Sequence, residues 1–249
     1  MNTTNESYPS LWLDRAALPT YPALAANERA DVCVVGAGIA GLTTAYLLTR
    51  AGKSAIVLDA GSIISGETQR TTAHLVTALD DRYFELERLH GEHGAKLAAE
   101  SHAAAIDTIE QIVGEEKIDC DFERVDGYLF SAAERPSAEL DRELAATHRA
   151  GLTKTKIVDR APLASFDTGR ALLFPRQGQF HPLKYLQGLQ KAYLAAGGVL
   201  LENTRIDSLK NEGDIHIAQA ATIISKAKNV VYATHMPPNI NVFNFECTP

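Results

Sequence analysis

Between residues 32 and 58, two continuous apolar runs lie on either side of one amphipathic stretch. The runs Val32–Val35 and Ala55–Leu58 contain no charged position, which is typical of strands buried on both faces of a sheet. Between them, apolar residues recur at helical spacing from about Ile39 to Ala51, and Gly52 is suited to end a helix. The order strand, helix, strand predicts a parallel α/β unit.

The α/β rhythm stops at about Asp80. The segment Gly94–Lys117 has the pattern of a long amphipathic helix, and a second helix is predicted from about Pro136 to Ala150. Between them, Asp121–Ala132 predicts a strand, a turn at Asp126-Gly127, and another strand.

The last third of the chain returns to alternating helix and strand patterns. The segment Phe174–Pro182 is predicted to be a turn-rich link, with Pro182 at the first position of a helix that runs to about Ala196. Val199–Ile206 and about Lys228–Thr234 predict two further strands.

Composition narrows the class of protein. The 249 residues are 45% hydrophobic and 22% charged, as in an ordinary globular protein. The net charge of −7 argues against a nucleic-acid partner. Cys33, Cys120 and Cys247 have no metal-ligand or disulfide spacing, which favours a reducing, cytoplasmic setting. We expect no signal peptide and no membrane span, since the N-terminus is polar and no apolar run is long enough.

The strongest motif follows the first predicted strand. Gly36, Gly38 and Gly41 have the spacing G-x-G-x-x-G: the first glycine allows a tight turn, the second leaves room for a diphosphate, and the third lets the helix approach the strand. The N–H groups of the first helical turn would face the anion. Asp59 ends the second strand, where an acid accepts hydrogen bonds from a ribose. The sequence therefore predicts dinucleotide binding, against the alternative of a glycine-rich turn in an unrelated α/β domain.

A polar loop, Gly61–Leu75, follows Asp59 instead of the second helix that an NAD enzyme would show. Several of its residues could line a diphosphate from the side opposite the first helix: Ser65, Gly66, Arg70, Thr71 and Thr72. The alternative is a solvated surface loop.

No side-chain nucleophile or metal constellation stands out. His74 and His181 are weak catalytic candidates, for which structural hydrogen bonding is the competing interpretation. Arg176 could hold a carboxylate but is favoured as a surface ion pair. Three histidines on helical segments are interpreted as surface residues rather than metal ligands: His90, His93 and His102.

With these motifs placed, the chain resembles the D-amino-acid oxidase and glycine oxidase group of FAD-dependent oxidoreductases. The runs GETQRTTAHL and FPRQGQFHPLKYL are most similar to bacterial members with a C-terminal Rieske iron–sulfur domain. The resemblance implies an FAD site with the following residues: Gly36, Gly38, Ile39, Ala40, Gly41, Asp59 and Ala60 for the ADP half; Gly66, Arg70, Thr71 and Thr72 along the diphosphate; Ile206 at adenine; and Ala233 and Thr234 near the cofactor. His235 replaces a glycine of the family's motif there.

The resemblance also implies the fold. We expect an α/β protein: a Rossmann-like FAD-binding domain with an inserted α+β substrate-domain segment. The expected division is an N-terminal arm (1–30), an FAD-binding βαβ unit with its diphosphate loop (31–79), the inserted segment (80–175), and a return to the FAD-binding domain (176–249). Because the family continues beyond the match, we expect this chain to be the N-terminal part of such an enzyme.

The implied function is oxidation of a C–N bond in a small-molecule amine or amino acid, with hydride transfer to N5 of FAD. The alternatives are an NAD-dependent dehydrogenase and a catalytically inactive, truncated flavin-binding module. No motif specifies an oligomeric state.

Overall fold

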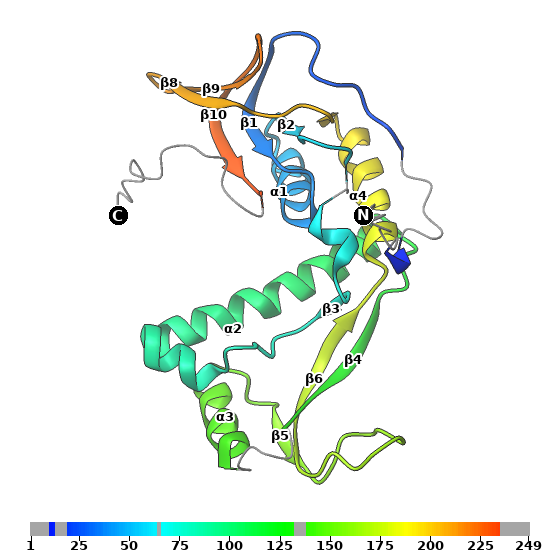
Figure 1. Ribbon diagram of the computed structural model, residues 1–249, viewed down its shortest axis with the longest axis vertical. Helices are drawn as coiled ribbons and strands as arrows, with labels where there is room; N and C mark the ends of the chain where they lie inside the picture. Colours follow the sequence, from blue (N-terminus) through cyan, green and yellow to red (C-terminus); the bar gives the residue numbers. More distant parts are fainter. Residues whose placement is uncertain (1–9, 13–18, 64–65, 132–137, 235–249) are drawn as a thin grey trace, which may run out of the picture. The chain divides into compact units, whose positions relative to one another are not determined.

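The computed structural model describes residues 10–12, 19–63, 66–131 and 138–234 (Figure 1). The chain forms two compact units, and each is interrupted in sequence. Unit 1 contains residues 1–71, 118–120 and 182–249, and unit 2 contains residues 72–117 and 121–181.

Unit 1 is built on a six-stranded mixed sheet in the order β7-β2-β1-β10-β9-β8. The first four of these strands are parallel, whereas β9 is antiparallel to both β10 and β8. The strands have these bounds: β1 Glu28–Val35, β2 Ala55–Leu58, β7 Val199–Leu201, β8 Ser208–Glu212, β9 Ile215–Ala220 and β10 Ile223–Tyr232.

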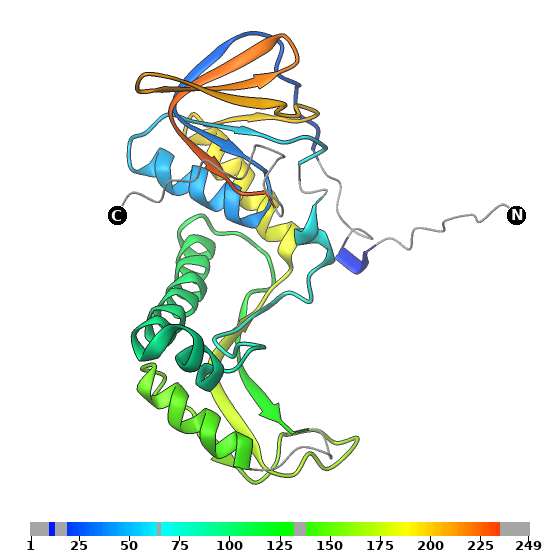
Figure 2. The same cartoon turned by 60° about the vertical axis from the view of Figure 1, so that its left-hand side comes forward.

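Two helices, α1 (Ile39–Arg50) and α4 (Pro182–Ala195), pack against each other beside the parallel strands (Figure 2). One buried apolar cluster of unit 1 includes Cys33 of β1, Ile56 of β2 and Ala218 of β9. These three strands therefore share a core. Because every residue of β2 is buried, the prediction of a strand covered on both faces is confirmed.

Two predictions in unit 1 were wrong in extent. The strand β7 ends at Leu201 rather than Ile206, and β10 begins at Ile223 rather than near Lys228. The hairpin β8–β9 was not predicted; it turns at Gly213, where φ is +61°.

Unit 2 contains a second sheet, in the order β3-β6-β4, with β5 also paired to β6. Its helices α2 and α3 and the sheet enclose a core that includes Tyr83, Leu140 and Phe174. The elements have these bounds: β3 His74–Leu75, α2 Tyr83–Glu115, β4 Glu123–Phe130, α3 Ala138–Arg149, β5 Lys156–Val158 and β6 Ala171–Gln179.

Three predictions in unit 2 were wrong. The helix α2 begins at Tyr83 and continues across a kink at Gly91, where φ is +73°. The expected strand–turn–strand is the single strand β4, and Asp126-Gly127 lies at a bulge rather than a turn. The expected turn-rich link is mostly strand β6, because Pro175 and Arg176 are accommodated as the extra residues of that bulge.

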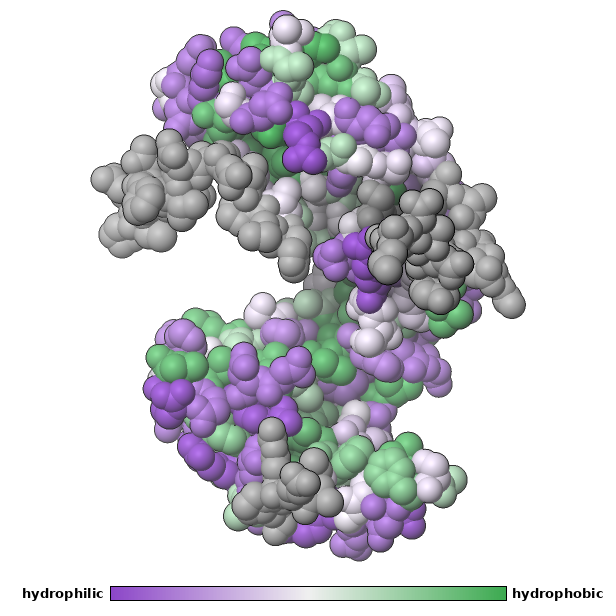
Figure 3. All heavy atoms as spheres, viewed as in Figure 1, coloured by the Kyte–Doolittle hydropathy of each residue, from purple (hydrophilic) through white to green (hydrophobic). Residues whose placement is uncertain are grey.

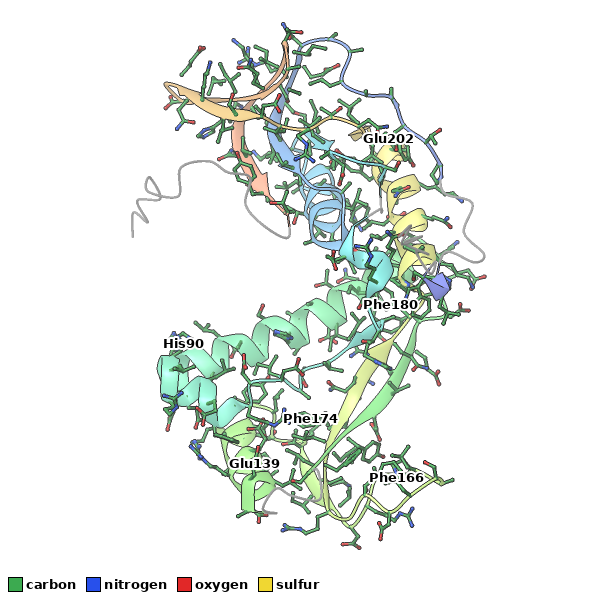
Figure 4. All side chains as sticks on the ribbon, in the orientation of Figure 1. His90, Glu139, Phe166, Phe174, Phe180 and Glu202 are labelled. Atoms are coloured by element: carbon green, nitrogen blue, oxygen red, sulfur yellow. The ribbon has the colours of Figure 1, made fainter. Side chains whose placement is uncertain are left out.

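The loop between β5 and β6 exposes apolar side chains. Leu163 and Phe166 are 38% and 51% exposed, and the Phe166 ring meets the edge of Phe130 at a centroid distance of 5.8 Å. Phe166 is labelled in Figure 4, and Figure 3 shows a hydrophobic patch in the same place. Among the described residues, no helix is both long and apolar enough to cross a bilayer.

Candidate functional site

The four parallel strands of unit 1 present their carboxyl ends along one edge of the sheet. Backbone hydrogen bonds connect these ends: Gly36 donates to Leu58 O at 2.8 Å, and Ala233 donates to Val35 O at 2.8 Å. Ligands of open α/β sheets bind at this edge, where strand order reverses around the first strand.

The G-x-G-x-x-G segment turns directly from β1 into α1. Gly36 has φ +105°, and a Cβ there would lie 2.7 Å from Ala233 O. A Cβ on Gly41 would lie 1.9 Å from Gly36 O, so only glycine permits this approach of helix to strand. The conformational reasons given for the first and third glycines are thus visible in the structure.

Gly38 lies at the N-terminus of α1 and supplies no side-chain cap. Its missing Cβ leaves a space bounded by Thr68 Oγ1, 3.3 Å from where that Cβ would be. Thr68 Oγ1 also accepts a hydrogen bond from Ile39 N at 3.2 Å. A Cβ on Gly38 would therefore crowd Thr68 Oγ1. The bare backbone at this helix N-terminus is suited to the close approach of a diphosphate.

Thr68 was not among the predicted residues. It belongs to the 3₁₀ helix η2 (Glu67–Arg70) in the polar loop. The sequence marked this loop as rich in donors, but only the tertiary structure distinguishes Thr68 from the neighbouring hydroxyls.

The Asp59 carboxylate is bound to the glycine turn. Its Oδ2 accepts from Ala37 N at 2.7 Å, and its Oδ1 accepts from Gly61 N at 2.9 Å. A carboxylate has about four acceptor sites, so each oxygen can accept a further hydrogen bond. Asp59 therefore orders the turn and can still receive a hydroxyl.

Other predicted residues of unit 1 lie on loops that border this edge. Thr204 N donates to Asp59 O at 2.7 Å, which ties the loop carrying Ile206 to the end of β2. The Ile206 side chain is buried in the core, whereas Ala60 is exposed. Arg70 is exposed and pairs with Glu67 at 3.3 Å.

The N-terminal residues that the structure describes fasten the polar loop from outside. Ser10 Oγ donates to Gln69 O, and Trp12 Nε1 donates to Thr71 O at 2.9 Å. Further along, Thr234 is exposed after β10, and His235 lies outside the described residues.

The remaining predicted residues are Thr72, His74 and His181. They belong to unit 2, whereas the glycine turn belongs to unit 1. Thr72 is exposed just before β3, and His74 is the exposed first residue of β3, opposite Gln179. His181 immediately precedes α4 and has interaction partners. Within the described ranges, no group of three or more His, Cys, Asp or Glu side chains could hold a metal ion.

Comparisons with known proteins agree with this geometry. The chain is 34% identical over 234 residues to YhfW of Bacillus subtilis, named as a Rieske 2Fe-2S iron–sulfur protein; the match covers 93% of this chain and 45% of that protein. It is 28% identical over 185 residues to gamma-glutamylputrescine oxidoreductase of Escherichia coli, covering 73% of this chain and 43% of that protein. The chain therefore spans about half the length of the relatives it matches.

Solved structures share the fold at low identity. Glycine oxidase from Geobacillus kaustophilus aligns with a TM-score of 0.68 and 19% identity, over 83% of this chain and 55% of that one. L-proline dehydrogenase from P. horikoshii aligns with a TM-score of 0.66 and 19% identity, over 84% and 53%. The predicted α/β fold class is confirmed.

The family model described as FAD dependent oxidoreductase matches residues 31–238, which include the whole glycine turn, Asp59 and the end of β10. The chain belongs to this family of FAD-dependent oxidoreductases.

Proposed function

We propose that the chain binds FAD along the carboxyl edge of the parallel strands in unit 1 and serves the oxidation of a C–N bond in an amine or amino acid. The observation that carries this proposal is the bare backbone of Gly38 at the N-terminus of α1, where a Cβ would crowd Thr68 Oγ1. The family match names FAD as the cofactor that this turn would bind.

The residues fall into three roles in this proposal. The backbone of the glycine turn, with Thr68 beside it, would hold the diphosphate, and Asp59 would accept a ribose hydroxyl. The backbone near Ile206 would meet adenine. The following residues complete the proposed site: Gly36, Ile39, Ala40, Gly41, Ala60, Gly66, Arg70, Thr71, Thr72, Ala233 and Thr234.

The substrate class follows from the names of the relatives. They include an oxidoreductase of gamma-glutamylputrescine, a glycine oxidase and an L-proline dehydrogenase, whose named substrates each contain a C–N bond. When bound, FAD supplies the acceptor for the hydride that leaves the carbon attached to nitrogen. The chain's own part is to hold the cofactor. We further propose that unit 1 forms the FAD-binding domain. Unit 2, which contains the expected segment 80–175 and also residues 72–79 and 176–181, would be the substrate-domain segment.

The test is to express the 249-residue chain and measure copurified flavin by its visible absorption. We expect bound FAD in the wild type and its loss in Gly38→Val, because the added methyl groups would occupy the space required by the diphosphate. Gly114→Val is the matched control, since a Cβ at Gly114 meets nothing within 4 Å.

Two outcomes decide between the functional alternatives. Reduction of the bound flavin by amines or amino acids under anaerobic conditions supports the oxidase proposal. Stoichiometric flavin that no such compound reduces supports the flavin-binding module instead. Wild-type flavin content in Gly38→Val would contradict the assignment of the site itself.

A further inference from the structure

The short helix η2 carries Thr68, the side chain beside Gly38, but has little internal support. It lies against α4, yet none of its four residues is buried, and Gly66 supplies no side-chain cap to its first turn. The ends of any helix also leave backbone N–H and C=O groups without partners inside the helix. The position of Thr68 therefore depends on contacts that η2 makes with other parts of unit 1.

Residues 10–12 bind the carbonyl groups at the C-terminal end of η2. Ser10 Oγ donates to Gln69 O, and Trp12 Nε1 donates to Thr71 O at 2.9 Å. Ser10 Oγ also accepts from Trp12 N at 3.3 Å, which joins the two donors to each other. Figure 2 shows residues 10–12, in dark blue, beside η2. Two side chains that lie 59 residues away in the sequence thus cap this helix.

The N-terminal arm has a second attachment, at the loop that follows β7. Pro22 O accepts from Glu202 N at 3.1 Å, and Leu24 N donates to Thr204 Oγ1 at 3.0 Å. The Leu24 side chain is buried, and the same loop carries Ile206, which we place near adenine. The arm therefore contacts the polar loop and the loop after β7, both of which border the proposed FAD site.

The Thr68 hydroxyl can bind an anion without losing its present hydrogen bond. Its Oγ1 accepts from Ile39 N at 3.2 Å, and no acceptor for its proton lies within hydrogen-bond distance among the described residues. A hydroxyl has one donor proton and two acceptor lone pairs. Because a Cβ on Gly38 would lie 3.3 Å from Oγ1, an oxygen of a diphosphate bound beside Gly38 would be a suitable acceptor for this proton.

We propose that Ser10 and Trp12 are positioning residues for the cofactor, which hold η2 so that the Thr68 hydroxyl stays beside Ile39 N. This inference rests on the proposed FAD site and adds the N-terminal arm to its requirements. Neither Ser10 nor Trp12 would touch FAD. They would raise its affinity because a loop that is already ordered loses less conformational entropy when the diphosphate binds.

Titration of the flavin-free 249-residue chain with FAD, followed by flavin fluorescence, tests the proposal. Trp12→Phe keeps an aromatic ring but removes the donor to Thr71 O, and Ser10→Ala removes the donor to Gln69 O. We expect each substitution to raise the dissociation constant of FAD roughly 2- to 10-fold, the effect of one lost hydrogen bond. Urea unfolding without FAD checks that each variant is folded, and Ser10→Ala decides the case if Trp12→Phe is not.

Two exposed positions provide matched controls. Leu11→Ala changes the residue between the two donors, whose side chain is 80% exposed. Ser101→Ala repeats the serine substitution at an exposed position of α2. Both controls should bind FAD with wild-type affinity. Wild-type affinity in both Ser10→Ala and Trp12→Phe would overturn the proposal.

A double-mutant cycle with Thr68→Val distinguishes positioning from general support of the fold. Valine has nearly the shape of threonine but no hydroxyl, so in this background the arm has no Thr68 hydroxyl to position. Trp12→Phe should therefore weaken FAD binding less in Thr68→Val than in the wild type. Equal losses in the two backgrounds would show that the arm does not act through Thr68.

The result for the FAD site itself is obtained separately. If the wild type binds FAD and Gly38→Val does not, the site stands, and normal affinity in the two arm variants contradicts only the role of the arm. If the wild type does not bind FAD, or if Gly38→Val binds it equally well, the proposed site fails and the role of the arm fails with it.

Discussion

Asp59 shows how one side chain can serve both the fold and the proposed site. Its carboxylate accepts from Ala37 N and Gly61 N, which follow the ends of β1 and β2 along the chain. An acid at this position was predicted only as a ribose acceptor. The structure adds that the same group orders the backbone against which the cofactor would bind.

Substitution of Asp59 separates these two roles. Asp59→Ala should weaken FAD binding by roughly 1–3 kcal/mol, the scale of a hydrogen bond to a charged group. Asp59→Asn should lose less, because its one amide oxygen can still accept from Ala37 N or from a hydroxyl. The measurement is a fluorescence titration with FAD, together with urea unfolding without FAD. Equal dissociation constants for the wild type and Asp59→Ala would exclude a ribose contact.

Individual residues were predictable where a backbone requirement selects one residue type. Gly36 and Gly41 could be assigned from spacing alone, because the turn and the helix–strand approach admit no side chain. Thr68 could not be assigned, because many loop hydroxyls satisfy the same description and only the folded loop brings this one to Ile39 N.

At the scale of elements, the N-terminus of α2 is capped by a residue from another helix. Arg82, which precedes α2, supplies no side-chain cap. Glu143 of α3 accepts from Tyr83 N at 3.0 Å and from Phe84 N at 3.3 Å. This carboxyl is 1% exposed, and burial raises its pKa against the lowering effect of the two backbone hydrogen bonds.

The raised pKa of Glu143 predicts a dependence of stability on pH. Above the ordinary carboxyl pKa of about 4.3, the folded state retains a proton that the unfolded state releases, so the free energy of unfolding falls as pH rises towards the folded pKa. Glu143→Gln should remove this part of the fall. Urea unfolding between about pH 4 and pH 7 measures it, with Glu100→Gln on the exposed face of α2 as the control. An identical pH dependence in Glu143→Gln and the wild type would show that Glu143 does not titrate in this range.

Elements were predicted best where a strand is buried on both faces or where apolar residues recur at helical spacing. The strands β1 and β2 and the helices α1 and α4 follow apolar patterns that admit one interpretation. The strand β6 was misread because Pro175 and Gly178 are turn residues in most contexts, although a bulge accommodates the first of them here. The hairpin β8–β9 was missed because its exposed positions are polar and weaken the strand signal.

At the scale of the whole molecule, the sheet of unit 1 joins residues much farther apart in sequence than the sheet of unit 2 does. The ion pair between Asp31 and Lys228 joins β1 to β10 across 197 residues, whereas the hydrogen bond from Gln179 to Glu123 joins β6 to β4 across 56. The α/β class was predictable because local patterns reveal strands and helices. The pairing of β1 with β10 depends on no local signal.

These separations predict the order of folding. Because closing a longer loop costs more entropy, we expect the sheet of unit 2 to form before β10 pairs with β1. Pulse-labelling hydrogen exchange during refolding of the chain should protect amides of β4 and β6 before those of β1. Simultaneous protection of both sheets, or earlier protection of β1, would contradict this order.

The central position of β10 beside β1 also has a consequence for synthesis in the cell. At about 5–20 residues per second, a ribosome needs roughly 10–40 s to add the 197 residues that separate the two strands. During that interval the edge of β1 that later pairs with β10 is exposed to solvent. Gly36 also lacks the Ala233 carbonyl against which it packs. We therefore expect the segment that would receive the nucleotide to remain incomplete, and unable to hold the cofactor, until translation has passed β10.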